Sequence, residues 1–284
     1  VSGTVFGSAT SITFTNGVAT ASMILYKAET ATVATSDGTL STSGADRLTV
    51  VVSGAAASAV TSTLAVSTNT VAVTGTLTAT ITVLDAYSNN LTTGTSISGG
   101  TVVPGAGTGS FGPWTCNAGT SCTATWTGGS TPGSTRLTAT IGSSAIHGNP
   151  QTITVTAGAA AELAITGAGT QTAGSSQTIT ITAKDAQGNT ATSYVGPKSL
   201  TFNGASNSPN STIPTVQATR FGSPTSVTFT NGVATASMAL YKVETAVVSA
   251  NDGTISATGS DRLSVEVSSA AADPAVSSLS ASTS

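Results

Sequence analysis

Both cysteines and both tryptophans of the chain lie in one short stretch, GPWTCNAGTSCTATW, at Gly112–Trp126. Cys116 and Cys122 are six residues apart, which suits pairing across a hairpin in which Gly112 lies opposite Trp126. Side chains alternate between the two faces of a strand, so five of these residues would share one face: Trp114, Cys116, Cys122, Ala124 and Trp126. This pattern predicts a Cys116–Cys122 disulfide beside a tryptophan-containing core, and a disulfide indicates an oxidising, extracellular setting.

Two other interpretations of the same residues stay open. Free thiols or a metal site would have only Cys116, Cys122 and the distant His147 as ligands, too few for structural zinc. Alternatively, Trp114 and Trp126 could face outward and form a platform on which sugars stack. Neither interpretation supplies a catalytic group.

The remaining candidates for chemistry are isolated. His147 is the only histidine, and no nucleophile motif accompanies it. Four acidic residues fall in turns, where an Asx-turn explains each of them: Asp37, Asp85, Asp185 and Asp252. The chain contains repeated modules, and their two complete joints lie at Val52–Ala59 and Val155–Glu162. These joints carry a single acidic residue, Glu162, whereas calcium needs six to eight oxygen ligands. We therefore expect no catalytic site, no cofactor and no metal, and we expect that the chain is not an enzyme.

A Lys-x-Glu pair follows a tyrosine twice, as Lys27 with Glu29 and as Lys242 with Glu244. We expect each pair to lie on a strand with both side chains on one exposed face. The alternative is a covalent cross-link from a buried lysine to an Asn or Asp, assisted by the acid.

The chain repeats itself over a long interval. The string TFTNGVATASM occurs at Thr13–Met23 and again at Thr228–Met238, and Phe6–Ser53 aligns on Phe221–Ser268 with 34 identities in 48 positions. The offset of 215 residues is too long for a solenoid unit of about 20–50 residues and suits two domains of roughly 100 residues each.

A weaker similarity relates the two domains to each other, because ITVLDAYSNN at Ile81–Asn90 resembles ITAKDAQGNT at Ile181–Thr190. We predict alternating modules of types A and B. Their boundaries are as follows: 1–53 is the C-terminal half of a type-A module, 54–157 a complete type-B module, 158–268 a complete type-A module and 269–284 the first strand of a further type-B module.

Half a sandwich cannot bury its core, so the half-module at 1–53 needs a complement. One expectation is that the sequence is a window on a much longer array. The other is that neighbouring copies complete one another by strand exchange, which would make the chain its own partner.

The composition excludes several classes of function. Eight basic residues in 284 positions cannot form a phosphate-binding patch, so nucleic acid is not expected. There is no run of 18 apolar residues and no basic amphipathic stretch, so we expect no membrane insertion. Charged residues make up 7% of the chain, and such a surface resists self-association poorly.

Alternation of apolar residues with threonine, as in Ser11–Tyr26 (SITFTNGVATASMILY), predicts strands, and Asn16-Gly17 and Asn231-Gly232 predict tight hairpins. With turn signals every 8 to 15 residues and no helical pattern, the chain is expected to be all-β, built from antiparallel β-sandwiches. The short joints, rich in alanine and glycine, predict a semi-rigid rod in which one A+B unit advances roughly 70–90 Å.

Segments such as Ala173–Gly196 and Thr228–Gly253 resemble the bacterial immunoglobulin-like (Ig-like) modules of invasin- and intimin-type surface proteins. Asp185–Asn189 (DAQGN) resembles the Asp-x-x-Gly-Asn turn of that family, whereas Asp85–Asn89 (DAYSN) has Ser88 in place of the glycine. The resemblance implies tandem Ig-like sandwiches in a secreted or surface protein, with functions that range from spacer to adhesin.

We therefore expect a structural extracellular protein that forms a stalk, fibre or sheath on a prokaryotic cell. An adhesin whose modules bind glycans is the alternative. The repeat region of a secreted hydrolase and a bacteriophage virion decoration also stay open, because such modules occur in both.

Overall fold

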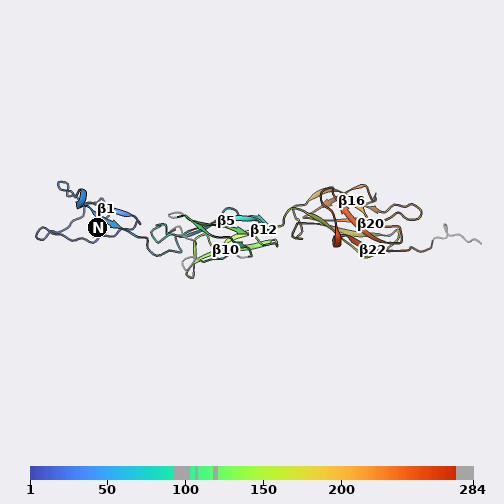
Figure 1. Cartoon of the computed structure of the whole chain (residues 1–284), viewed down its shortest axis with the longest axis horizontal. Coiled ribbons are helices and arrows are strands. Elements are labelled where there is room, and N and C mark those ends of the chain that lie inside the picture. The colour runs from blue at the N-terminus through green and yellow to red at the C-terminus, as the bar shows by residue number, and fades with distance from the viewer. Residues whose placement is uncertain (92–102, 106–107, 118–120, 273–284) are drawn as a thin grey trace, which may run out of the picture. The chain divides into compact units, whose positions relative to one another are not determined.

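The computed structural model describes residues 1–91, 103–105, 108–117 and 121–272 (Figure 1). These residues form strands, two short 3-10 helices and no α-helix, and the expected all-β class is confirmed. In this part of the chain, no helix is long and apolar enough to cross a membrane. Of the predicted further type-B strand at 269–284, residues 273–284 lie outside the described residues.

The chain divides into two compact units, and the division does not follow the predicted module boundaries. One unit comprises Val1–Asn69, Thr76–Thr127 and Thr135–Ile153, and the other comprises Thr70–Gly75, Gly128–Ser134 and Thr154–Ser284. Three short segments of the predicted type-B stretch, 70–75, 128–134 and 154–157, are thus grouped with the second unit. The module boundaries and the rod-like arrangement stay predictions.

The predicted type-A stretch forms two five-stranded sheets, with the orders β13-β15-β20-β17-β18 and β14-β22-β21-β16-β19. The first sheet consists of β13 (Glu162–Thr166), β15 (Ser176–Lys184), β20 (Val233–Ala239), β17 (Thr215–Val216) and β18 (Thr219–Arg220). The second consists of β14 (Thr170–Thr172), β22 (Leu263–Ser268), β21 (Thr245–Asn251), β16 (Gly196–Asn203) and β19 (Pro224–Phe229).

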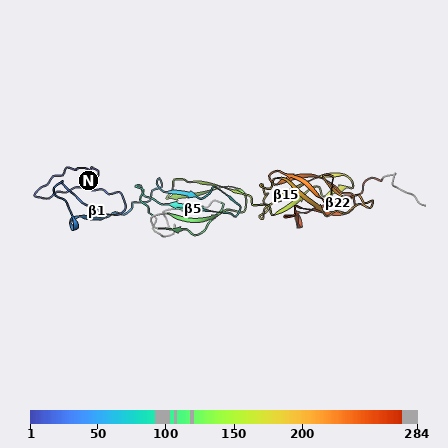
Figure 2. The same cartoon turned by 90° about the horizontal axis from the view of Figure 1, so that it is seen from above.

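Strict alternation along these strands builds one core between the two sheets (Figure 2). Ile179 and Ile181 of β15 are buried while their threonine neighbours face outward, and Leu200 and Phe202 of β16 join the same cluster from the other sheet. β-branched and aromatic side chains suit such half-buried strands. The result is a β-sandwich, as the period-2 pattern predicts.

The predicted type-B stretch also forms two five-stranded sheets. One has the order β3-β5-β9-β7, with β8 also on β9, and the other has the order β11-β10-β12-β4, with β6 also on β10. The bounds of the first are β3 (Thr63–Val66), β5 (Thr76–Thr82), β9 (Cys122–Thr127), β7 (Ser110–Phe111) and β8 (Thr115–Cys116). Those of the second are β11 (Ser144–Ala145), β10 (Gly133–Ile141), β12 (Gln151–Thr156), β4 (Thr70–Ala72) and β6 (Val103–Gly105).

Each pair of sheets contains a parallel strand pair, which departs from the antiparallel expectation. β4 pairs with β12, and β14 with β22, in parallel. The reason is that the first segment of each stretch changes sheets: β3 and β13 belong to one sheet, whereas β4 and β14, only a few residues later, belong to the other.

Residues 1–53 form much less structure than their copy at 216–268. They contain only β1 (Thr30–Val33), β2 (Leu48–Val51) and a 3-10 helix, η1 (Gly44–Asp46). These match β21, β22 and η2 (Gly259–Asp261), and the register Thr30↔Val51 reappears as Thr245↔Glu266. The Asn16-Gly17 turn also forms, with positive φ at both residues, as it does at Asn231-Gly232.

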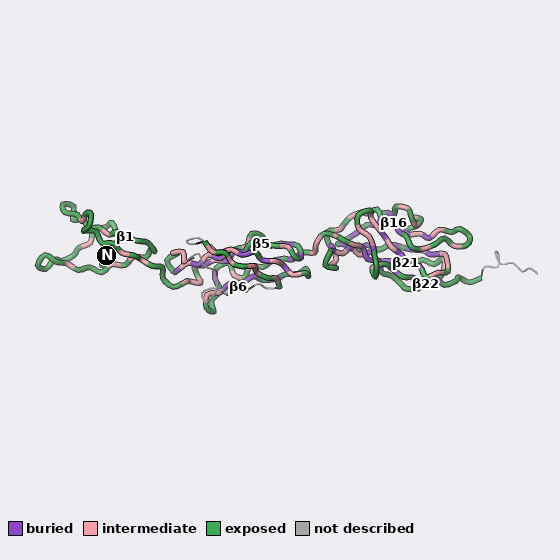
Figure 3. The backbone as a smooth tube through the Cα atoms, in the orientation of Figure 1, coloured by how far each residue is buried: buried purple, intermediate pink, exposed green. Residues whose placement is uncertain are grey.

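The strands missing from residues 1–53 are the counterparts of β19 and β20, whose pairing partners lie in the N-terminal half of the type-A stretch. β19 pairs with β16, and β20 pairs with β15, and residues 1–53 include no counterpart of either partner. Ile12, Phe14 and Leu48 are consequently 40%, 64% and 57% exposed, whereas their copies Val227, Phe229 and Leu263 are 1%, 2% and 7% exposed. No residue of 1–53 is buried (Figure 3).

We predict that the two copies of the repeated hairpin differ greatly in amide hydrogen exchange. The amides of Ile12–Ile24 should exchange on the order of a thousandfold faster than those of Val227–Ala239, because only the second copy has ladder partners and a core. Exchange followed by peptide mass spectrometry measures this, since residues 12, 24, 227 and 239 distinguish the peptides. Equal protection of the two copies would show that residues 1–53 already have a complement.

Candidate functional site

The residues with catalytic or metal-binding potential do not gather in the described part of the chain. No three His, Cys, Asp or Glu side chains there could hold a metal ion together. The His147 side chain is exposed. Its backbone serves the sheet, because its N–H donates to the Ser62 carbonyl at 2.9 Å and its carbonyl accepts from the Leu64 N–H at 2.9 Å.

The predicted disulfide joins Cys116 to Cys122, and these two residues pair across β8 and β9 as expected. The expected register fails farther from the bridge, because Phe111, and not Gly112, lies opposite Trp126. One additional residue is therefore accommodated between Phe111 and the bridge. Pro113 lies in this bulge, where a residue without an N–H donor costs no ladder hydrogen bond.

The two tryptophans differ in burial. Trp126 is fully buried, whereas Trp114 is half-buried and its ring lies 5.1 Å from that of Phe111. Trp114 lies in the segment between Phe111 and Thr115, where no strand pairing holds its side chain against the core. A sugar-stacking platform formed by both tryptophans is therefore wrong, because Trp126 cannot reach a ligand.

The Lys-x-Glu pairs are ion pairs, but they do not lie on strands. The distance from the lysine nitrogen to the glutamate oxygen is 2.5 Å for Lys27–Glu29 and 3.1 Å for Lys242–Glu244, and each pair directly precedes a strand, β1 or β21. The Lys27 side chain is 77% exposed. The cross-link that requires a buried lysine is thus not supported, and such exposed pairs contribute little to stability.

The four turn aspartates fall into two classes. Asp37 accepts the backbone N–H groups of Thr39 and Leu40, as an ordinary Asx-turn does. Asp85 and Asp185, by contrast, are almost completely buried, although each sits in a turn. Burial of a charged group requires compensating hydrogen bonds, and these bonds define the candidate functional site.

Asp85 binds its own turn and the start of its own module. Its Oδ1 atom accepts from the N–H groups of Tyr87 and Asn89, each at 2.9 Å. Its Oδ2 atom accepts from the Ala55 N–H and from the Asn89 side-chain amide, each at 2.8 Å. The carboxylate therefore ties the joint residue Ala55 to a turn that lies 30 residues later.

Asp185 repeats this arrangement in the type-A stretch. Its Oδ1 atom accepts from the N–H groups of Gln187 and Asn189 at 2.9 Å. Its Oδ2 atom accepts from the Gly158 N–H at 2.8 Å and from the Asn189 side-chain amide at 3.1 Å. Gly158, like Ala55, lies at a predicted joint, so in both stretches a buried aspartate binds the backbone at that joint.

Both carboxylates stay ionised down to acidic pH. Burial raises the pKa of Asp85, but the Asn89 side chain and the backbone N–H groups of Ala55, Asn89 and Tyr87 together lower it to about 2. Burial likewise raises the pKa of Asp185, and the bonds from Gly158 and Asn189 lower it below its ordinary value. N–H donors around a carboxylate favour its charged form, so the turn keeps its bonds throughout the neutral range.

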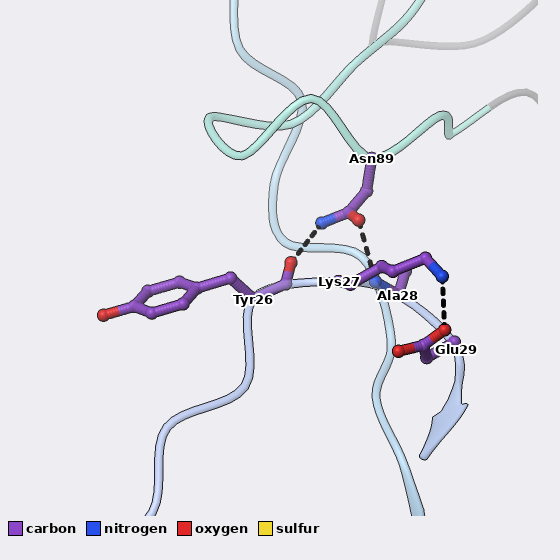
Figure 4. A network of polar contacts seen from close by, with 5 residues as sticks. All are labelled: Tyr26, Lys27, Ala28, Glu29 and Asn89. Atoms are coloured by element: carbon purple, nitrogen blue, oxygen red, sulfur yellow. Dashed lines mark hydrogen bonds and ion pairs between the residues drawn. The ribbon is translucent and has the colours of Figure 1, made fainter. Parts of the chain in front are cut away.

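The asparagine at the end of each turn reaches into the preceding stretch of chain. The Asn89 side-chain amide donates to the Tyr26 carbonyl at 2.7 Å, and its carbonyl oxygen accepts from the Ala28 N–H at 2.7 Å (Figure 4). It therefore pairs with the backbone of Tyr26–Ala28 as a neighbouring strand would. The Tyr87 ring adds a contact with the Tyr26 ring at 4.7 Å.

Asn189 makes a corresponding but smaller contact, because its side-chain amide donates to the Ser130 carbonyl at 2.9 Å. The role of Asn89 and Asn189 was missed in the sequence. The similarity between Ile81–Asn90 and Ile181–Thr190 marked the right residues, but the pattern shows a turn and not what the turn contacts.

Two further contacts join the N-terminal and C-terminal halves of the type-A stretch. The Tyr194 hydroxyl donates to Asp252 at 2.5 Å, and Lys184 forms an ion pair with Asp261 at 2.5 Å. Burial, together with the Asp252 carboxylate, raises the pKa of Tyr194. Asp37 and Asp46 are the counterparts of Asp252 and Asp261, and within the described residues they lack these partners.

No protein-family model and no curated protein sequence matches the chain. Among solved structures, the FdeC adhesin of Escherichia coli is 24% identical with a TM-score of 0.45, and the match covers 78% of this chain and 68% of that one. Invasin, a bacterial integrin-binding protein, is 17% identical with a TM-score of 0.48, over 78% of this chain and 43% of that one.

The surface-layer protein SbsC, in its domains 5–6, is 21% identical with a TM-score of 0.26, over 72% of this chain and 96% of that one. This chain thus spans less than half of the invasin chain and about two thirds of the FdeC chain. These matches concern the fold alone, and they agree with the resemblance to invasin-type Ig-like modules.

We predict that Ser88→Gly stabilises the chain, because Ser88 has a φ of 65° where Gly188 of the other turn has 80°. A residue with a side chain is strained in this region, so the substitution should raise the free energy of unfolding by about 0.5–1 kcal/mol. The matched reverse change, Gly188→Ser, should lower it by about 1 kcal/mol. Denaturant unfolding measures both, and a destabilised Ser88→Gly variant would contradict the strain argument.

Proposed function

We propose that this chain is a structural segment of an extracellular prokaryotic surface protein, in which alternating type-A and type-B Ig-like modules act as spacers in a stalk, fibre or sheath. The observation that carries this proposal is the repeated turn at Asp85–Asn89 and Asp185–Asn189. In both copies a buried aspartate holds the first residues of its module, and the asparagine binds the preceding stretch. A joint held by such hydrogen bonds limits the bending between successive modules, as a spacer requires.

The chemistry of the chain favours this role over catalysis. The described residues contain no cluster of metal-ligating side chains, and the isolated His147 is exposed. The Cys116–Cys122 disulfide suits an oxidising, extracellular compartment. Long apolar runs and basic patches are absent from the sequence, which leaves binding to like modules as the simplest use of a weakly charged surface.

We also propose that residues 1–53 are completed by a further copy of a segment like Gly158–Asn203. The exposed faces of Ile12, Phe14 and Leu48 are those that this segment covers in the complete module. In the complete module this segment supplies β15 and β16, which pair with β20 and β19. An equivalent segment of a neighbouring copy would add to residues 1–53 in the same way, by strand exchange.

A distance measurement tests the spacer role. Spin labels on the full chain at Thr125→Cys and Thr228→Cys, two exposed strand positions, should give a single narrow distance distribution by double electron–electron resonance. Cys116 and Cys122 are bridged and do not compete for the label. Asn189→Ala removes the bond to Ser130 and should broaden the distribution about twofold or more, because the lost bond is one of few at that joint.

Asn207→Ala is the matched control, since Asn207 is exposed in a loop and makes no side-chain hydrogen bond among the described residues. It should leave the distribution unchanged. A broad distribution in the chain without either substitution would mean a flexible tether, and the spacer role would then be rejected.

Adhesion is a second candidate function, and one observation favours it. The residues Tyr26 and Tyr87 are 53% and 56% exposed and lie beside Lys27, Ser88 and Asn90 in a shallow groove. Aromatic rings with neighbouring polar groups suit sugar binding. Binding of the chain to a glycan array should be lost in Tyr87→Ala and kept in Gln187→Ala. The absence of any bound glycan would remove this candidate.

A further inference from the structure

We propose that the backbone of Tyr241–Val243 is a docking surface for a type-B module, which it binds through a turn equivalent to Asp85–Asn89. The inference rests on the proposed modular function and extends it to a specific surface, occupant and rule of order. The chain contains two copies of this surface, one at Tyr26–Ala28 and the other at Tyr241–Val243.

The first copy of the surface is occupied. The Tyr26 carbonyl and the Ala28 N–H make two hydrogen bonds with the Asn89 side chain, both at 2.7 Å. This recognition uses only backbone atoms, so it does not depend on the side chain at position 28. Figure 4 shows the amide of Asn89 aligned against this segment while Lys27 and Glu29 pair on one side of it.

The second copy has the same local structure. Val267 donates to the Glu244 carbonyl at 2.9 Å, as Val52 does to the Glu29 carbonyl at 2.9 Å. Lys242 and Glu244 form the same ion pair as Lys27 and Glu29. The segment Tyr241–Val243 therefore presents a carbonyl and an N–H in the order that Asn89 recognises in the first copy.

Those two groups are unused in the described part of the chain. Neither the Tyr241 carbonyl nor the Val243 N–H makes a hydrogen bond there, and Val243 is 60% exposed. A carbonyl and an N–H spaced in this way resemble an exposed strand edge. Another strand can add to such an edge, and so can a side-chain amide that makes the same two hydrogen bonds.

The occupant is a type-B turn and not a type-A turn, because the two turns differ in what accompanies the asparagine. In the type-B turn the Tyr87 ring contacts the Tyr26 ring of the first copy at a tilt of 51°, whereas the type-A turn has Gln187 at that place. The type-A asparagine instead reaches the Ser130 carbonyl alone. Tyr241 repeats Tyr26 in the second copy, so the surface there offers a tyrosine ring to the same kind of turn.

The test replaces residues 269–284 by a second copy of residues 54–157, joined directly after Ser268, and follows one amide. Hydrogen exchange at the Val243 amide is measured by NMR in this extended chain and in the unextended chain of 284 residues. Relative to the unextended chain, exchange should slow about tenfold or more on extension, since the amide gains a hydrogen bond in a new interface. The protection should be lost when the asparagine of the added turn, equivalent to Asn89, is replaced by alanine.

A matched extension tests the rule of order. Joining residues 158–268 after Ser268 adds a type-A module, and Val243 should then exchange as fast as in the unextended chain. Equal protection by both extensions would overturn the choice of a type-B occupant. A Val243 amide that is already protected in the unextended chain, or that no extension protects, would overturn the docking surface itself.

The existing joint provides an independent readout if the added module fails to fold. In the unextended chain, Asn89→Ala should speed exchange at the Ala28 amide about tenfold, and unchanged exchange would overturn the recognition on which the proposal rests. The spin-label measurement probes the bond between Asn189 and Ser130. Failure of this inference and failure of the spacer function are therefore distinguishable.

Discussion

A buried carboxylate surrounded by N–H donors is the interaction on which the order of each complete module depends. Asp85 and Asp185 are almost completely shielded from solvent, and among the described residues neither forms an ion pair with a lysine or an arginine. Each needs the joint residue, the turn backbone and the asparagine side chain at once, because a buried charge that loses a donor is strongly destabilised. The same bonds that satisfy the charge therefore fix the joint to the turn and aim the asparagine outward.

The core imposes a second constraint, since neither half of a type-A module can bury its apolar face alone. β19 and β20 exist in the complete module because β16 and β15 pair with them. Nearly the same sequence at residues 9–24 keeps its Asn-Gly turn but not its strands. The Asn-Gly turn therefore forms without a partner segment, whereas strand pairing and burial do not. Most of the stability of a type-A module thus comes from the contacts between its two halves.

The sequence predicts those features that arise from local pattern. Alternating Thr and Ile in β15, the two Asn-Gly turns and the pairing of Cys116 with Cys122 each follow from period or spacing. The bulge at Pro113 does not, because a break in register depends on the neighbouring strand. The burial of Asp85 and the contacts of Asn89 were also out of reach, since a polar turn has the same composition whether it faces solvent or another stretch of chain.

The two hydrogen bonds that the Asn89 side chain makes with Tyr26 and Ala28 use only backbone atoms of these two residues. The two copies of the docking segment differ at Ala28 and Val243, the position at which Asn89 uses only the N–H group. Tyr26, Lys27 and Glu29, by contrast, are identical to Tyr241, Lys242 and Glu244. A side chain can therefore vary where only its backbone is bound, and it is kept where a ring or an ion pair shapes the segment. Position 28 is thus free to vary without loss of the hydrogen bond that Asn89 makes there.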